Sequence, residues 1–176
     1  MDRYVTTLII AIFYVNPMQR ILLSFIKNIW CSDNMDLYKF CIKWISNMLK
    51  GNKNNSCLYL KGPQGLGKST IPLFLNLHVI GDPLCLESGS EPIKSKFNSI
   101  LAGKLLVVFE ELENFGTAEW QTISQKLKRM ISSTLISIQS KGVDEYSTTN
   151  INNYILISNN DAIQDDDGRR YCILDL

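Results

Sequence analysis

The stretch CLYLKGPQGLGKST, residues 57–70, combines an apolar segment with a glycine-rich loop and decides the fold class of the chain. Its first five residues form a short apolar segment typical of a buried strand. Residues 62–69 then match the pattern G-x-x-x-x-G-K-[ST] without deviation. In this pattern glycines let backbone N–H groups curl around phosphate oxygens, which requires a strand before the loop and a helix after it. The alternative is a glycine-rich turn that binds nothing.

The phosphate-binding pattern assigns roles to single residues. Lys68 would contact the β and γ phosphates of a nucleotide, and the hydroxyl of Ser69 would ligate Mg²⁺. We therefore predict a nucleotide site with ATP and Mg²⁺ as cofactors. Its predicted binding residues are Gly62, Pro63, Gln64, Gly65, Leu66, Gly67, Lys68, Ser69 and Thr70.

Strand and helix patterns alternate after this loop. Helical patterns cover 70–80, 95–103 and 117–132, and apolar strands are predicted at 84–86, 104–111, 153–158 and 169–176. Alternation around a Lys-Gly turn in 135–148 predicts a β-hairpin. This order of elements favours an α/β fold with a parallel sheet that is covered on both faces.

Three regions follow from these patterns. Residues 17–55 read as a helical subdomain that ends in a polar linker, and residues 56–176 form the predicted core. Residues 1–16 are an unassigned apolar leader, whose apolar run is shorter than the roughly 20 residues that span a bilayer. Because its flanks suit a signal peptide poorly, we expect a cytoplasmic or nuclear protein that is not secreted and has no membrane partner.

The charges of the chain are balanced but segregated. There are 18 basic and 17 acidic side chains, so overall charge gives no argument for a nucleic-acid partner. Residues 37–81 and 120–143 nevertheless contain lysines or arginines and no acid. Five cysteines without a C-x-x-C pair indicate reduced thiols rather than disulfides or zinc, and the single histidine, His78, is expected to be structural.

The strand at 104–111 ends in two carboxylates, Glu110 and Glu111. At the carboxyl edge of a parallel sheet they would emerge beside the phosphate loop. We assign Glu110 to magnesium and Glu111 to activation of a water molecule, a role that hydrolysis needs and transfer to another substrate does not. A solvated strand end before an acidic loop is the alternative.

Two further polar positions follow predicted strand and loop boundaries. Asn159, after the strand at 153–158, could position the attacking water, although two asparagines at a strand end are often only a turn. Arg169 and Arg170 could neutralise transition-state charge, and would make hydrolysis depend on assembly if they came from a neighbouring subunit. A surface salt bridge with the acids at 165–167 is the alternative.

The order GPQGLGKS, a strand ending in EE, KRMISS…SIQSKG, ILISNN and GRRY resembles a superfamily 3 helicase. It is most similar to the helicase domain of phage and large-DNA-virus primase-polymerases, including the poxvirus-type primase-helicases. The resemblance covers about residue 20 to 176. It implies a P-loop NTPase core of the AAA+ type, with a five-stranded sheet of order 5-1-4-3-2 and an N-terminal helical extension. It also implies a homo-oligomeric ring, usually a hexamer, that moves along DNA with ATP.

The resemblance also assigns residues. Gly62, Gly67, Lys68 and Ser69 match Walker A, Glu110 and Glu111 match Walker B, Asn159 matches the sensor, and Arg170 matches the arginine finger with Arg169 as competitor. The segment 128–142 matches a hairpin that points into the ring channel, where Lys141 and Lys128 would contact the DNA backbone. The family's primase, polymerase and zinc-binding parts have no counterpart here, and we expect no C-terminal lid after Leu176.

The leading hypothesis is an ATP-dependent viral-type replicative DNA helicase core. Its expected partners are single-stranded or forked DNA, further copies of the chain, and a separate primase-polymerase. The alternatives are a viral ATPase that acts on RNA, and a truncated ring subunit that binds nucleotide and DNA without hydrolysis. A small-molecule kinase would explain neither Glu111 nor the basic hairpin.

Overall fold

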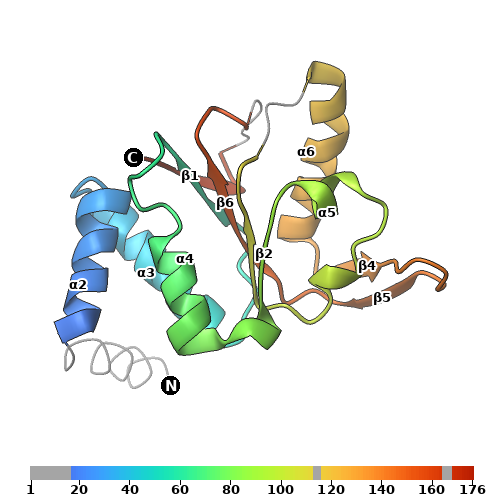
Figure 1. The fold of residues 1–176 in the computed structure, drawn as a ribbon, viewed down its shortest axis with the longest axis horizontal. Coiled ribbons are helices and arrows are strands. Elements are labelled where there is room, and N and C mark those ends of the chain that lie inside the picture. The colour runs from blue at the N-terminus through green and yellow to red at the C-terminus, as the bar shows by residue number, and fades with distance from the viewer. Residues whose placement is uncertain (1–16, 113–115, 164–167) are drawn as a thin grey trace.

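The computed structural model describes residues 17–112, 116–163 and 168–176 (Figure 1). The predicted leader at 1–16 and the acids at 165–167 lie outside the described residues. None of the helices that are described is long and apolar enough to pass through a membrane.

Five parallel strands form the central sheet. They are β1 (Cys57–Lys61), β2 (Cys85–Ser88), β3 (Leu106–Phe109), β6 (Asn153–Ser158) and β7 (Tyr171–Asp175). Their order is β2-β3-β6-β1-β7. This numbering differs from the expected 5-1-4-3-2 because β4 and β5 lie outside the sheet. Counted alone in chain order, the sheet strands follow one another from the β7 edge as fifth, first, fourth, third and second.

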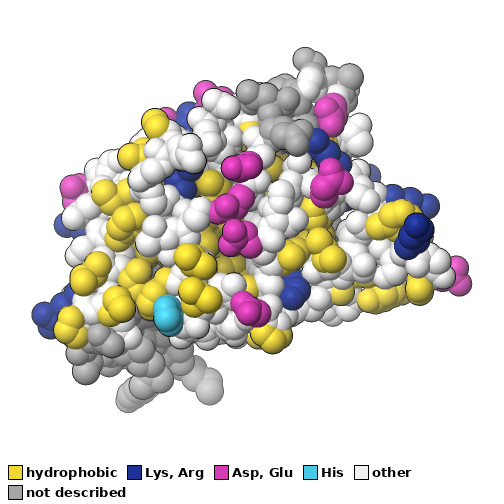
Figure 2. Space-filling view, in the orientation of Figure 1, with side chains coloured by type: hydrophobic (Ala, Val, Ile, Leu, Met, Phe, Trp, Pro, Cys, Tyr) yellow, Lys and Arg dark blue, Asp and Glu magenta, His cyan; other side chains and the backbone are white. Residues whose placement is uncertain are grey.

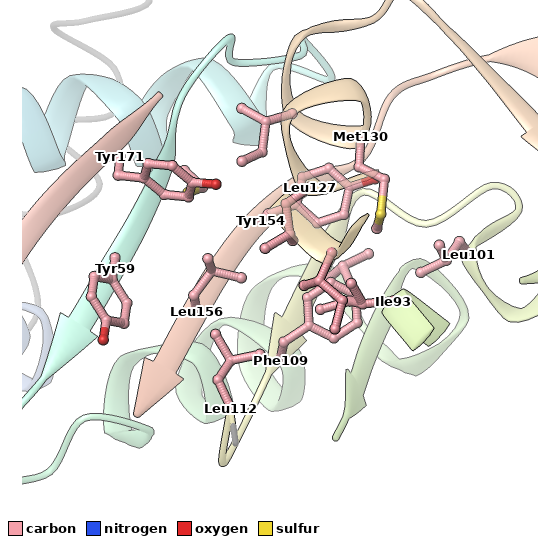
Figure 3. Close-up of a cluster of buried hydrophobic side chains, with 14 of the residues drawn as sticks. Tyr59, Ile93, Leu101, Phe109, Leu112, Leu127, Met130, Tyr154, Leu156 and Tyr171 are labelled. Atoms are coloured by element: carbon pink, nitrogen blue, oxygen red, sulfur yellow. The ribbon is translucent and has the colours of Figure 1, made fainter. Parts of the chain in front are cut away.

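Alternate side chains of these strands enter two apolar clusters, one on each face of the sheet. On one face Phe109 and Tyr154 stack with ring centroids 6.1 Å apart (Figure 3). The other face carries Val108 and Ile155. Both residue sets are almost fully buried, as expected for a parallel sheet that has helices on both sides.

Helices cover the two faces unequally (Figure 1). One face carries α2 (Pro17–Phe25), α3 (Met35–Leu49) and α4 (Thr70–Leu75), and the other carries α5 (Glu91–Lys94) and α6 (Thr117–Ser132). Single π-helical turns extend α2 to Trp30 and α4 to Ile80. The α3 helix begins at a side-chain cap, because the Asn34 side chain accepts hydrogen bonds from the backbone N–H groups of Asp36 and Leu37 at 3.0 and 3.2 Å.

The helix predicted at 95–103 is wrong. Short 3₁₀ turns lie at Asp82–Leu84 and Ser99–Leu101, and the unpredicted α5 precedes the second of them. Asn98 explains the difference, because its side chain donates to the carbonyl of Ser137 at 2.8 Å and accepts from the N–H of Gln139 at 2.9 Å. Together with the backbone N–H of Asn98, which donates to the carbonyl of Gln139 at 3.1 Å, these bonds tie the segment to the hairpin.

The predicted hairpin is present as a separate two-stranded sheet. Its strands are β4 (Leu135–Ile138) and β5 (Tyr146–Thr149), which pair antiparallel. The turn contains Lys141 and Gly142, and Gly142 has a φ of +75°. In Figure 1 the hairpin extends from the side of the sheet that carries α6, away from α4.

The polar linker at 51–56 is tied closely to the sheet. The fully buried Asn153 accepts from the backbone N–H of Asn54 at 2.7 Å and donates to the carbonyl of Asn52 at 3.1 Å. Lys53 donates to the carbonyls of Met130 and Asn152, both at 3.0 Å, and burial lowers its pKa to about 8. These hydrogen bonds of the linker therefore fix the end of α3 relative to β6 and α6.

Replacing Asn153 by Ala should lower the free energy of unfolding by about 1–3 kcal/mol, since the buried backbone groups that it serves lose their partners. Urea denaturation would measure the change. Asn28→Ala, at an exposed position of the π-helical turn, is the matched control and should change stability little. Equal stability of the two variants would contradict the role given to Asn153.

Candidate nucleotide-binding site

Polar residues that follow three neighbouring strands meet at one edge of the sheet. The glycine-rich loop follows β1, Glu110 follows β3, and Asn159 follows β6, and these strands pair in parallel as β3-β6-β1. Carboxyl ends of parallel strands lie at the same edge, which brings these side chains around one open cavity of about 340 Å³. Its lining comprises Gln64, Gly65, Gly67, Lys68, Ser69, Thr70, Glu110, Glu111, Ile157, Ser158 and Asn159.

The Lys68 ammonium connects the loop to the end of β6. The side chain is 6% exposed, and its nitrogen donates to the carbonyls of Gly62 and Pro63 at 2.6 and 2.7 Å. It also donates to the amide oxygen of Asn159 at 2.9 Å. Burial lowers the pKa of Lys68, whereas the nearby Glu110 carboxylate acts in the opposite direction. The three hydrogen bonds satisfy the charge and hold it at the floor of the cavity.

Ser69 and Glu110 form the second connection, in which the Ser69 hydroxyl donates to a carboxylate oxygen of Glu110 through a short hydrogen bond. Hydroxyl and carboxylate oxygens are ligands that Mg²⁺ accepts. Within the described ranges, no group of three or more His, Cys, Asp or Glu side chains is arranged to hold a metal ion. The pair therefore fits Mg²⁺ bound by few protein ligands together with phosphate oxygens and water, which is the usual manner for this ion.

A third carboxylate, Glu87 on β2, stands near this pair. Glu87 lies opposite Val108 in the sheet, so it shares a face with Glu110 two positions further along. Partial burial and, to a lesser degree, the negative charge of Glu110 raise the pKa of Glu87. The sequence analysis did not single out Glu87, because only the pairing of β2 with β3 brings it to this place.

Glu111 reaches the cavity through an unusual backbone conformation. Strand alternation would place it on the opposite face from Glu110. Glu111 lies two residues after the end of β3 and has a φ of +53°, and the N–H of Leu112 then donates to the carbonyl of Ile157 at 3.3 Å. A left-handed conformation costs a non-glycine residue about 1–2 kcal/mol, and such strain is concentrated at functional sites.

Two motif glycines are required by close contacts. Gly62 has a φ of +145°, and a Cβ there would lie 2.5 Å from the backbone oxygen of Leu176. Gly67 has a φ of +78°, and a Cβ there would lie 2.6 Å from the Cζ atom of Phe25. The sequence analysis missed Phe25 and the contact of Leu176, since no local pattern reports contacts between such distant segments.

The remaining predicted residues lie away from the cavity. Arg169 and Arg170 precede β7, and the carbonyl of Arg170 accepts from the N–H of Cys57 at 2.8 Å, at the start of β1. Arg170 is therefore separated from the glycine-rich loop by the length of a five-residue strand, about 16 Å. Its Nε donates to the Ser132 hydroxyl at 2.9 Å.

The predicted DNA contacts are also remote from the cavity. Lys128 lies on α6, and the exposed Lys141 lies in the hairpin turn. His78 is exposed beside Phe74, with ring centroids 5.0 Å apart, and does not line the cavity. All five cysteines are free thiols, as predicted.

Comparison with solved structures places the fold. The chain is similar to the apo structure of the NrS-1 C-terminal region, with a TM-score of 0.76 at 20% sequence identity. The match covers 86% of the present chain and 37% of the NrS-1 chain. The A form apo structure of that region gives a TM-score of 0.71 at 22% identity, with 86% of the present chain and 36% of that chain covered. The present chain thus spans little more than a third of these structures. At this identity the likeness concerns the fold: a mixed α/β domain with a five-stranded parallel sheet.

The sequence comparison then gives the family. The chain belongs to DUF5906, a family of unknown function, whose model matches residues 60–170. That range contains the glycine-rich loop, both carboxylates, Asn159 and both arginines. No curated protein matches the chain. The finer resemblance to superfamily 3 helicases stays a prediction.

The backbone at Glu111 can be tested by itself. Glu111→Gly should have a free energy of unfolding about 1 kcal/mol higher than Glu111→Ala, because both lack the carboxylate and only glycine relieves the positive φ. The same pair at Glu119, an exposed position within α6, should give the reverse order. Chemical denaturation measures all four variants, and equal values for the Glu111 pair would contradict a strained backbone.

Proposed function

We propose that the chain is the ATP-hydrolysing core of a DNA helicase of the viral replicative type. The observation that carries the proposal is the meeting of Lys68, Ser69, Glu110, Glu111 and Asn159 around one cavity, although they come from three separate segments. A glycine-rich turn without a ligand does not account for two carboxylates and an amide at the same edge.

Each residue of the cavity would have a separate role in ATP hydrolysis. Lys68 would exchange its loop carbonyls for the β and γ phosphate oxygens, whose negative charge compensates its burial. Ser69 and Glu110 would hold Mg²⁺, which neutralises charge on the phosphates when it is bound. Asn159, already bonded to Lys68, would orient the attacking water near the terminal phosphate.

Glu111 favours hydrolysis over transfer to another substrate. Its carboxylate lines the cavity beside Glu110 and is well placed to accept a proton from the attacking water. With Glu110 assigned to the metal, the second carboxylate is available as a base. A kinase would leave this strained and acidic position without a role.

Arg170 supports a site that is completed by a neighbouring copy. It lies at the amino end of β7, on the opposite edge of the sheet from the cavity of its own chain. In a ring of like subunits that edge could face the next cavity, and an arginine supplied in this way would stabilise transition-state charge. The hairpin with Lys141 would then contact the backbone of a DNA strand, and such contacts are independent of sequence and sensitive to salt.

Lys68→Ala should abolish ATP hydrolysis while the chain still folds, since the ammonium is the cationic group of the described cavity lining and its hydrogen bonds go to the loop and to Asn159. Steady-state ATPase assays measure the loss, and circular dichroism checks the fold. Lys50→Ala, at an exposed position after α3, is the control and should retain activity. Substantial turnover by Lys68→Ala would overturn the assignment.

Completion of the site by a second copy predicts concentration dependence and complementation. ATPase activity per mole of chain should rise with protein concentration. Arg170→Ala and Lys68→Ala should each be inactive alone, but a mixture should recover activity, because one variant supplies an intact loop and the other an intact arginine. Arg169→Ala, mixed in the same way, tests the competing arginine. Activity that is independent of concentration, with no recovery on mixing, would contradict the trans arrangement.

Two other functions share the same nucleotide site. A viral ATPase acting on RNA would displace strands on forked RNA rather than forked DNA. A truncated ring component that only binds nucleotide and DNA would, as the isolated chain, remain monomeric and show no ATP turnover at any concentration. The carboxylate of Glu111 favours the hydrolytic functions over the second of these.

A further inference from the structure

The proposed function leaves open where the nucleoside part of the ligand lies, and the following inference rests on that function. The terminal phosphate belongs beside Lys68 and Asn159, which meet at the edge of the sheet. The phosphate loop then turns into α4 at Thr70, which also lines the cavity. The nucleoside must therefore leave the loop on the side of Thr70, away from the tips of β3 and β6.

An aromatic side chain stands at this exit. Phe25, the last residue of α2, meets the loop so closely that a Cβ on Gly67 would lie 2.6 Å from its Cζ and 3.3 Å from its Cε2. The same Cβ would lie 3.0 Å from the hydroxyl oxygen of Thr70. Figure 1 shows the same arrangement in the ribbon, where α2 ends near the start of α4. Phe25 and Thr70 thus flank one point of the loop.

The Phe25 ring is only partly buried, although it belongs to the apolar cluster beneath α4. The ring approaches Gly67, which lines the cavity as its neighbour Thr70 does, so the partly exposed side chain lies directly behind two residues of the lining. A side chain needed only for packing would be expected to turn inward, as Ile26 does at 4% exposure. Partly exposed aromatic faces beside a phosphate site are suited to stacking with a base.

We infer that Phe25 forms the wall on which the base of a nucleoside triphosphate stacks, with Thr70 at the ribose side. The helical extension would thereby be part of the nucleotide site and not only a support. Phe25 would distinguish a nucleoside triphosphate from an inorganic triphosphate, since both present the same phosphates to Lys68 and Ser69. It would be a specificity residue and would take no part in the hydrolytic step.

The test compares ATP with inorganic tripolyphosphate, each with Mg²⁺, in calorimetric binding to the 176-residue chain. Phe25→Leu keeps apolar volume against Gly67 but removes the aromatic face. It should weaken ATP binding about ten-fold, in line with base–aromatic stacking, and leave tripolyphosphate binding unchanged. Phe25→Tyr should restore ATP binding. Leu22→Ala, which removes another partly buried contact of α2 with the same cluster, should not change the preference for ATP.

The outcomes separate the inference from the proposed function. If Phe25→Leu weakens the binding of both ligands equally, or of neither, Phe25 is a packing residue. The inference is then overturned, while the hydrolytic function stands. A wild-type chain that binds tripolyphosphate as tightly as ATP leads to the same conclusion. If the wild-type chain binds neither ligand, the proposed function fails and the inference falls with it.

Discussion

The hydrogen bonds of the Lys68 ammonium are the interaction on which the candidate site depends. They join two carbonyls of the glycine-rich loop to the amide of Asn159, so β1 and β6 are linked at their ends by one buried charge. A buried ammonium is costly unless all its donors have acceptors, and the loop supplies them only when it curls back on itself. The shape of the loop and the position of the Lys68 side chain therefore depend on each other.

The surroundings of the loop restrict that shape further. A Cβ at Gly62 would lie 2.5 Å from the backbone oxygen of Leu176, and a Cβ at Gly67 would displace the ring of Phe25. Both glycines also have a positive φ, so the loop shape excludes side chains at two of its positions. The helices before β1 share an apolar cluster with the sheet, so they stabilise the loop as well as cover the sheet face.

Local patterns predicted the parts of the fold that depend on neighbouring residues. The predictions of a helix at 117–132, a strand at 57–61 and a hairpin within 135–148 all agree with the structure. The failures have tertiary causes: Asn98 gives its hydrogen bonds to the β4 segment instead of a helix. The candidate site followed from the order of strands and motifs, whereas the backbone of Glu111 and the contact of Phe25 depend on crossings that sequence periodicity does not report.

The charges around the cavity bear on how the site would work. Among its described lining residues, Lys68 is the cation and Glu110 and Glu111 are the carboxylates, which leaves a formal charge of −1. A triphosphate adds several negative charges, so tight binding requires cations from outside the lining. Mg²⁺ at Ser69 and Glu110 would supply one such charge centre, and an arginine from a neighbouring copy would supply another. The negative lining is therefore suited to a triphosphate only together with added cations, and Arg170 of the same chain, at the amino end of β7, lies too far away to supply one.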